Sequence, residues 1–143
     1  VDTGATYGVP HSEGIARNKE ERIQLGKRLF TMMCATCHQA AGQGVASKYP
    51  PLAVSDFLNR DKNEAIRVLL HGRQGEISVN GITYNNTMPS FPLSDEDIAN
   101  ALTYTYNSFG NSGKDVTPEE VKALRAEKYI PSTSATNQPS QFE

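Results

Sequence analysis

The spacing of apolar side chains predicts four helices. In residues 18–33 the apolar side chains lie close to one helical stripe, behind Asn18, which fits an N-cap. Asp61 and Ser94 each open a capping box that is followed by an apolar run at helical spacing. A short fourth helix follows Thr117, with a proline in its first turn. The predicted helices are residues 18–33, residues 61–70 ended by Gly72, residues 94–109 ended by Gly110, and a short segment from 117 that carries Val121 and Leu124.

Between the helices the sequence predicts loops and one hairpin. Apolar and polar residues alternate between Gly75 and Asn86, on both sides of Asn80-Gly81, which is a typical two-residue hairpin turn. Residues 39–58 are rich in Gly, Ser and Pro and are expected to form an irregular loop. The expected organisation is a flexible leader or linker over 1–17, one folded domain over 18–130 and a disordered polar tail over 131–143.

The composition indicates a lean hydrophobic core. Of the 143 residues, 29 are Leu, Ile, Val or Phe, near the level at which a sequence fails to offset its ordering entropy. The formal net charge is −2 and no run of basic residues occurs, so nucleic acid is not an expected partner. The apolar stretches are far shorter than the roughly 20 residues that span a bilayer. We therefore expect proteins or small molecules as partners, and a group other than side chains in the core.

The two cysteines stand in the string Cys34-Ala35-Thr36-Cys37-His38. A Cys-x-x-Cys pair followed at once by His is the attachment signature of c-type haem. Each thiol adds across a haem vinyl group to form a thioether, and the imidazole is thereby held under the iron as an axial ligand. We therefore expect one covalent haem c. This group also accounts for the lean core, because the porphyrin is a large apolar body around which few side chains need to meet.

Two other uses of the cysteine pair stay open. A thioredoxin-like redox pair opens a helix in a strand–helix–strand unit, whereas the residues before Cys34 are predicted to be helical. A structural zinc site needs about four Cys or His ligands, and besides His38 the sequence offers only His11 and His71. Both alternatives fit the sequence less well than covalent haem.

The second axial position of such a haem decides its chemistry. A side chain there gives an electron carrier, whereas an open position permits binding and catalysis. We choose Met88, which follows His38 by fifty residues in a loop long enough to reach the far side of the haem. Pro89 favours an extended backbone at Met88 and stiffens that loop. The alternative for Met88 is a filler position in a proline-rich connection.

Other candidate ligands suit this position less well. Met32 and Met33 lie within about a turn of Cys34, on the helix that holds one haem edge, so we expect core positions for both. His71 stands at a predicted helix C-terminus, where an imidazole commonly caps carbonyl groups or stays solvated. His11 falls in the predicted leader, whose ordering would oppose ligation.

The chain resembles small monohaem cytochromes c with His and Met as iron ligands. The resemblance covers about residues 18–109. It rests on Cys34-x-x-Cys37-His38 after a helix with Gly26 and Phe30, then Pro50-Pro51-Leu52, Thr87-Met88-Pro89, and Leu93-Ser94-Asp95-Glu96-Asp97-Ile98-Ala99 before a helix with Tyr104. It implies an all-α cytochrome c fold with three core helices, a short extra C-terminal helix and a small β-hairpin around the haem. It also implies that the first and last core helices cross at Gly26, next to Phe30 and Tyr104.

The resemblance further implies roles for residues of the loop after the haem motif. The Pro50 carbonyl would accept the hydrogen bond of the proximal imidazole, which fixes the ring and increases its donor strength. Leu52 would pack on the haem. Arg67 and Arg73 are candidate partners of the haem propionates. The implied haem-binding set is Cys34, Cys37, His38, Pro50, Leu52 and Met88, with His38 and Met88 as the iron ligands.

A narrower resemblance concerns Gly42-Gln43-Gly44-Val45 and the segments 49–56, 71–75, 84–89 and 103–111. These strings are similar to the cytochrome domain fused to the C-terminus of some copper nitrite reductases, which passes electrons to the type 1 copper. Similar strings occur in cytochrome subunits of periplasmic dehydrogenases. The resemblance implies a periplasmic one-electron carrier that is not an enzyme on its own. A parent protein, if the chain is fused, would form nitric oxide from nitrite in denitrification.

The implied partners are redox proteins. They are a small periplasmic electron donor and a cupredoxin-type copper domain as acceptor. Two other functions stay open. The chain would instead be the cytochrome subunit of a periplasmic dehydrogenase, or a haem enzyme or gas-binding module if Met88 does not ligate iron.

Overall fold

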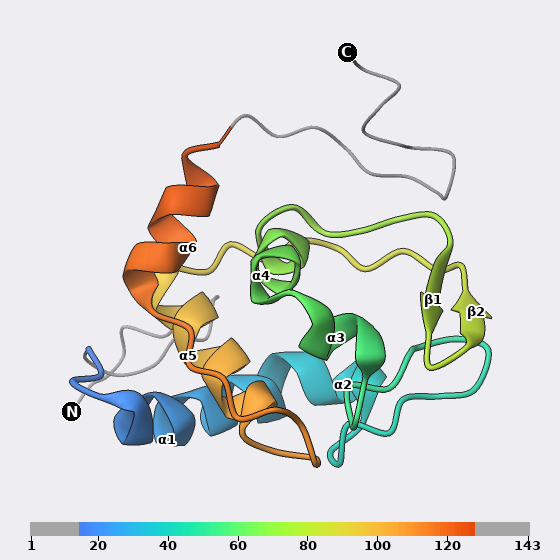
Figure 1. Ribbon diagram of the computed structural model, residues 1–143, viewed down its shortest axis with the longest axis horizontal. Helices are drawn as coiled ribbons and strands as arrows, with labels where there is room; N and C mark the ends of the chain where they lie inside the picture. Colours follow the sequence, from blue (N-terminus) through green and yellow to red (C-terminus); the bar gives the residue numbers. More distant parts are fainter. Residues whose placement is uncertain (1–14, 128–143) are drawn as a thin grey trace.

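The computed structural model describes residues 15–127, so the expected tail over 131–143 and most of the expected leader over 1–17 lie outside the described residues. Figure 1 shows a mostly helical molecule with one two-stranded hairpin, as predicted. Within these residues no helix has the length and apolarity that crossing a membrane requires. The elements are α1 (Lys19–Leu29), the π-helical turn η2 (Phe30–Cys34), α2 (Ala35–His38), α3 (Asp56–Arg60), α4 (Lys62–His71), β1 (Ile77–Val79), β2 (Ile82–Tyr84), α5 (Asp95–Tyr106) and α6 (Pro118–Arg125).

Side-chain caps begin the four predicted helices. Asn18, Asp61, Ser94 and Thr117 cap α1, α4, α5 and α6, and each side chain accepts a backbone N–H of the first turn. Thr117 also forms the reciprocal capping box with Glu120. Each cap satisfies an N–H group that has no partner within its helix. The predicted helix starts are therefore confirmed.

Two helix ends differ from the prediction, and one short helix was not predicted. The helix predicted over 18–33 continues through η2 and α2 as far as His38. α3 occupies part of the expected irregular loop over 39–58, because the Ser55 hydroxyl caps a single turn that is too short to show a hydrophobic period. α5 ends at Tyr106 and not at 109, because the Asn107 side chain donates to the Thr103 carbonyl at 2.8 Å and ends the helix there.

α1 and α5 cross at close range, as the resemblance implies (Figure 1). A Cβ atom at Gly26 would overlap the backbone carbonyl of Asn100 and would lie 2.8 Å from the Cβ of Tyr104. Next to this contact, the ring centroid of Phe30 lies 5.5 Å from that of Tyr104 and 5.2 Å from that of Phe109. The crossing therefore fixes the helix that leads into the cysteine motif against the centre of the fold.

The predicted hairpin is present at the end of the molecule opposite α6 (Figure 1). β1 and β2 pair antiparallel, with Ile77 opposite Tyr84. Asn80 and Gly81 form the turn at φ values of 53° and 82°, as the mirror-image hairpin turn with two positive φ values requires. Val79 and Tyr84 are buried and turn toward the interior.

α6 covers the junction of α4 and α5. Val121 is fully buried in the core cluster, which α4 and α5 also build. Ion pairs surround this apolar contact: Lys62 of α4 pairs with Glu120 at 2.8 Å, and Arg125 pairs with Asp95 of α5 at 2.7 Å. The short fourth helix is therefore part of the same core as the longer ones.

A polar network ties α1 to the segment between α5 and α6. Arg22 of α1 donates to both carboxylate oxygens of Asp115, at 2.8 and 2.7 Å. The Thr103 hydroxyl donates to the same carboxylate at 3.3 Å, and Lys62 donates to the Asp115 backbone carbonyl at 2.9 Å. The hydrogen bonds from Arg22 are the main reason that the pKa of Asp115 is lowered. Asp115 thus accepts hydrogen bonds from side chains of α1, α4 and α5.

Gly26→Ala is expected to lower the free energy of unfolding by about 1–3 kcal/mol, because the added methyl group overpacks a contact between two backbones. The gain in helix propensity, about 1 kcal/mol, does not offset this cost. Guanidinium unfolding of the haem-loaded protein measures the difference. Lys27→Ala, at the exposed neighbouring position, is the control and is expected to change stability by no more than about 0.5 kcal/mol. Equal effects of the two changes would contradict the close crossing.

Asp115→Asn is expected to flatten the loss of stability in acid. Arg22 keeps the folded-state pKa of Asp115 below its unfolded value of about 3.9, so the pair contributes stability above that pH. This contribution is lost as the pH falls through the folded pKa. The variant should be less stable at neutral pH and lose less stability between about pH 5 and pH 2. Urea unfolding at several pH values tests this, with the exposed Glu76→Gln as control; a profile parallel to the parent protein's contradicts it.

Candidate functional site

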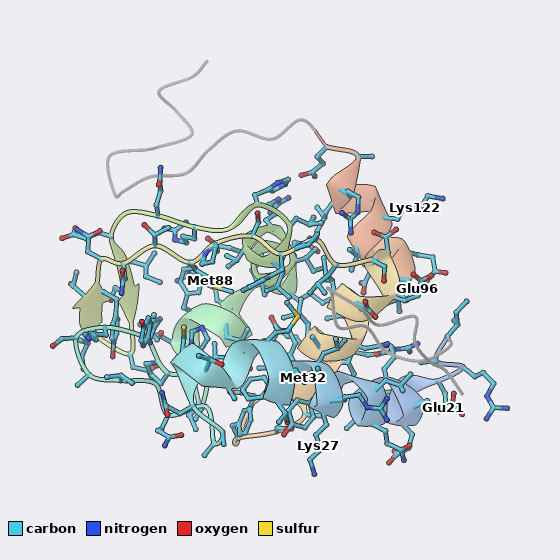
Figure 2. All side chains as sticks on the ribbon, turned by 180° about the vertical axis from the view of Figure 1, so that it is seen from behind. Glu21, Lys27, Met32, Met88, Glu96 and Lys122 are labelled. Carbon is cyan, nitrogen blue, oxygen red and sulfur yellow. The ribbon has the colours of Figure 1, made fainter. Side chains whose placement is uncertain are left out.

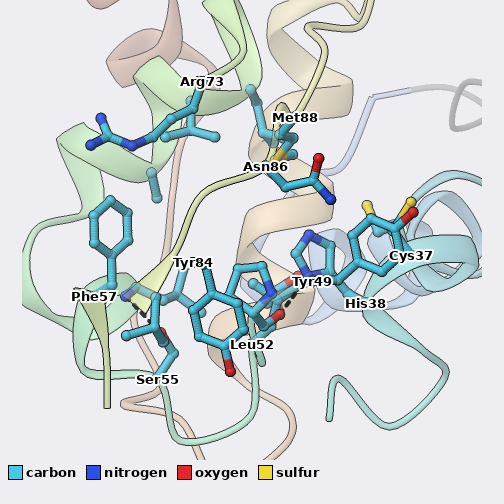
Figure 3. A pocket seen from close by; sticks show the side chains of 18 of the residues that line it. Cys37, His38, Tyr49, Leu52, Ser55, Phe57, Arg73, Tyr84, Asn86 and Met88 are labelled. Atoms are coloured by element: carbon cyan, nitrogen blue, oxygen red, sulfur yellow. Dashed lines mark hydrogen bonds between the residues drawn. The ribbon is translucent and has the colours of Figure 1, made fainter. Parts of the chain in front are cut away.

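An apolar cavity of about 570 Å³ lies between the cysteine motif, the loop that follows it, α4, the hairpin and the loop after the hairpin. This volume falls within the range of about 300–1,000 Å³ that is common for ligand and cofactor sites. Figure 3 shows side chains entering the cavity from several of these segments. All six residues of the expected haem-binding set line it: Cys34, Cys37, His38, Pro50, Leu52 and Met88.

His38 is the last residue of α2, and only 8% of its surface is exposed. Its Nδ1 donates to the Pro50 carbonyl at 2.8 Å, which is the hydrogen bond that the resemblance implies. Because that carbonyl can only accept, the ring proton is on Nδ1 and the lone pair of the neutral ring is on Nε2. Burial lowers the pKa of His38, although the hydrogen bond to Pro50 opposes this. A neutral imidazole in a fixed orientation is suited to bind a metal.

Two residues that hold the Pro50 segment were not predicted as site residues. Gly44 has a φ of 71°, and a Cβ there would lie 2.8 Å from the carbonyl carbon of Pro50. The side-chain amide of Asn111 donates to the Leu52 carbonyl at 2.8 Å and to the Thr105 carbonyl at 2.9 Å. Asn111 and Leu52 are 59 positions apart. No local sequence pattern predicts this pairing. Gly44 and Asn111 could have been singled out only because segments 42–45 and 103–111 resemble those of known cytochrome domains.

Cys34 and Cys37 lie on one continuous helical stretch beside the cavity. Cys34 ends η2, Cys37 lies in α2, and both are free thiols. Burial is the main cause that raises the pKa of Cys34 to about 11, with a further contribution from Cys37. Thioredoxin-like pairs have a lowered thiol pKa and open their helix, so both observations argue against that alternative. Within residues 15–127 no three Cys, His, Asp or Glu side chains gather as a metal-ion set.

Met88 reaches the cavity from the loop between β2 and α5 (Figure 3). It is half-buried and packs against the core cluster. Its backbone pairs with that of Arg73, just after α4, through two hydrogen bonds of 2.8 Å. The cysteine motif and Met88 thus approach the cavity from segments that are far apart in the sequence.

The other candidate ligands have different positions. Figure 2 shows Met32 and Met88 on separate segments. Met32 borders the cavity but is 56% exposed, so it does not have the buried core position that was expected. Adjacent residues of a helix point in directions about 100° apart, and it is Met33 that packs against the core. Among the described residues, His71 is not part of the cavity lining. His11 lies outside the described residues.

The charged residues Arg73 and Lys48 also line the cavity. The Arg73 guanidinium lies 5.7 Å from the ring centroid of Phe57. Arg67, the other expected propionate partner, instead pairs with Glu127 near the end of α6 at 3.2 Å. Of the two arginines, only Arg73 belongs to the described lining.

These residues fit a covalent haem c. Two thiols, a neutral imidazole with its lone pair on Nε2, and a thioether sulfur border one cavity whose other walls are largely apolar. Imidazole and thioether are the ligand pair of haem iron in electron-carrying cytochromes. The presence of this cavity agrees with the low content of Leu, Ile, Val and Phe, which predicted that a group other than side chains completes the core.

Comparison with known proteins agrees with this site. The sequence model of the cytochrome c family matches residues 23–108. Cytochrome c-552 of Thermus thermophilus is 44% identical over 116 residues, which cover 74% of this chain and 88% of that protein. A second cytochrome c-552 of the same species is equally similar and is covered over 78% of its length. The fructose dehydrogenase cytochrome subunit of Gluconobacter japonicus is 33% identical over 112 residues, which cover 71% of this chain but 22% of that subunit.

Proposed function

The chain belongs to the cytochrome c family, and we propose that it carries single electrons through one haem c held by Cys34, Cys37, His38 and Met88. Members of this family bind haem c covalently and act in electron transfer. The observation that carries the assignment of residues is that all four line one apolar cavity of the described structure. Cys34 and Cys37 would hold the haem through thioethers, and the imidazole of His38 and the thioether of Met88 would bind its iron.

Haem iron supplies a one-electron couple between the ferric and ferrous forms. The chain's own residues set the conditions for this couple. The Pro50 carbonyl fixes the His38 ring and increases its electron donation to the metal. The thioether of Met88 favours the ferrous form and so raises the reduction potential. The apolar walls, Leu52 among them, exclude water and limit reorganisation when the charge changes.

Two side-chain ligands leave no coordination position for a substrate. For this reason we propose that the domain is a carrier and not an enzyme on its own. Arg73 is the proposed partner of a haem propionate, because it lines the cavity whereas Arg67 pairs with Glu127. The proposed location is the periplasm, since haem c is attached on the oxidising side of the bacterial cytoplasmic membrane.

For the acceptor we propose the type 1 copper of a copper nitrite reductase. The strings 42–45, 49–56, 71–75, 84–89 and 103–111 support this proposal through their similarity to the cytochrome domains of such enzymes. A periplasmic dehydrogenase is the second candidate partner, and its support is the similarity to the fructose dehydrogenase cytochrome subunit. In the first case the chain donates electrons to the partner, and in the second it receives them.

Met88→Ala is expected to open the sixth coordination position. The parent ferric protein should show the weak red charge-transfer band of methionine-ligated haem, and the variant should lack it. Imidazole should bind the ferric variant roughly tenfold or more tightly than the parent, because it no longer competes with Met88. Met33→Ala, which removes a methionine that packs against the core, is the matched control and should keep the band. Rapid binding of carbon monoxide to the ferrous parent protein would favour the gas-binding alternative instead.

Stopped-flow mixing distinguishes the two partners. If the proposal is correct, a copper nitrite reductase oxidises the ferrous protein with a rate constant of roughly 10⁵–10⁷ M⁻¹s⁻¹, as docking of two specific surfaces allows. The same enzyme without its type 1 copper is the control and should not oxidise it. Reduction of the ferric protein by a sugar dehydrogenase, without oxidation by the copper enzyme, would favour the second candidate.

A further inference from the structure

We propose that Gly72 and Arg73, just after α4, clamp the backbone of Met88 and thereby position its sulfur for the iron. This inference rests on the proposed role of Met88 as the sixth ligand. Gly72 ends α4, and Arg73 lines the cavity as the proposed propionate partner; positioning Met88 is a further role for both residues. Figure 3 shows the side chains of Arg73 and Met88 at the cavity, and the contacts that form the clamp are made by the backbones of these segments.

The backbone N–H and the carbonyl of Met88 both form hydrogen bonds with the backbone of Arg73. The Arg73 N–H donates to the Met88 carbonyl at 2.8 Å, and the Met88 N–H donates to the Arg73 carbonyl at 2.8 Å. The two residues form an isolated antiparallel bridge. Directly opposed residues of such a pair point their side chains to the same face, and both Arg73 and Met88 do line the cavity. The bridge therefore determines the direction in which the Met88 side chain leaves the loop.

Gly72 provides the space for this bridge. Its φ is 75°, and a Cβ there would lie 2.6 Å from the Met88 carbonyl oxygen and 2.8 Å from the Ser90 nitrogen. These are backbone atoms of the ligand loop and cannot rotate away as a flexible side chain can. Restoring an ordinary contact of 3.4 Å would move the loop by about 0.8 Å. Metal and binding sites require their groups within about 0.5 Å of the productive position, so such a shift weakens ligation.

The clamp is attached to a rigid part of the molecule. α4 inserts Ile66, which is fully buried, and Leu69, which is 6% exposed, into the core. The ligand loop itself is stiffened by Pro89 but has no regular secondary structure of its own. The bridge thus connects an irregular loop to a helix whose position the core fixes. This connection reduces the freedom that Met88 loses on binding iron.

Gly72→Ala tests the clamp, and Gly81→Ala is its matched control. Both glycines have a positive φ, 75° and 82°, so Gly81→Ala controls for the loss of a glycine at positive φ. The ψ of Gly72 is −175°, a conformation that is essentially restricted to glycine, so Gly72→Ala carries more backbone strain than the control. A Cβ at Gly81 meets nothing within 4 Å, whereas a Cβ at Gly72 meets the Met88 loop. Backbone strain alone lowers stability, whereas the clamp also predicts altered ligation by Met88, so the properties of the haem iron and not the stability report the clamp. Both proteins are to be prepared with haem attached and compared by circular dichroism first.

In the Gly72→Ala protein the weak red band should lose most of its intensity, and the reduction potential should fall. Imidazole should bind its ferric form roughly tenfold more tightly than it binds the parent protein. The Gly81→Ala protein should match the parent in all three measurements. If Gly72→Ala behaves like Gly81→Ala while Met88→Ala abolishes the band, the clamp is refuted and the proposed function stands. If Met88→Ala leaves the band unchanged, the proposed function fails first.

Amide hydrogen exchange of the parent haem protein tests the bridge without any substitution. The Met88 N–H donates to Arg73, so its exchange should be slowed roughly a hundredfold or more relative to an unstructured chain. The Arg73 N–H should be slowed to a similar degree. Exchange of the Met88 amide at the rate of an open loop would overturn the inference, even if the Gly72 variant could not be folded.

Discussion

The close crossing of α1 and α5 is the contact on which the rest of the structure depends. At Gly26 the two backbones approach so closely that no Cβ fits, and the aromatic rings of Phe30 and Tyr104 pack beside the contact. α1 leads without interruption through η2 and α2 to His38. The depth of the crossing therefore decides where the thiols and the imidazole stand relative to the core. A displacement at Gly26 would be carried along one stiff helical stretch to the haem motif.

The cavity and the lean core are two aspects of one arrangement. Side chains of the helices, of the hairpin and of the loops enclose about 570 Å³ with largely apolar walls. In the haem protein these walls are covered by the porphyrin, whose burial adds the hydrophobic stabilisation that a short list of Leu, Ile, Val and Phe does not supply. Covalent attachment keeps this part of the core from dissociating.

Features carried by local signals could be predicted from the sequence, whereas features carried by distant contacts could not. Asn18, Ser94 and Thr117 mark helix starts because their own side chains cap the helices. The spacing of Cys34, Cys37 and His38 is itself a local signal, and it predicts haem attachment without any knowledge of the fold. The end of α5 was not predicted, because it depends on an Asn107 side chain that turns back to Thr103. The exposed position of Met32 depends on which face of the helix meets the core, which adjacent methionines do not reveal. Likewise, Asn111 reaches Leu52 across 59 positions, and only a fold brings them together.

The contacts of α6 determine where local unfolding of the molecule begins. Its apolar contact is flanked by partly exposed ion pairs, Lys62 with Glu120 and Arg125 with Asp95, which salt weakens. A short helix held by one apolar contact and exposed ion pairs belongs to the part of a protein that unfolds locally before the whole does. When it detaches, α4 loses a neighbour, and α4 is the helix that ends at Gly72. The last helix of the described residues and the loop that carries Met88 are in this way connected through α4.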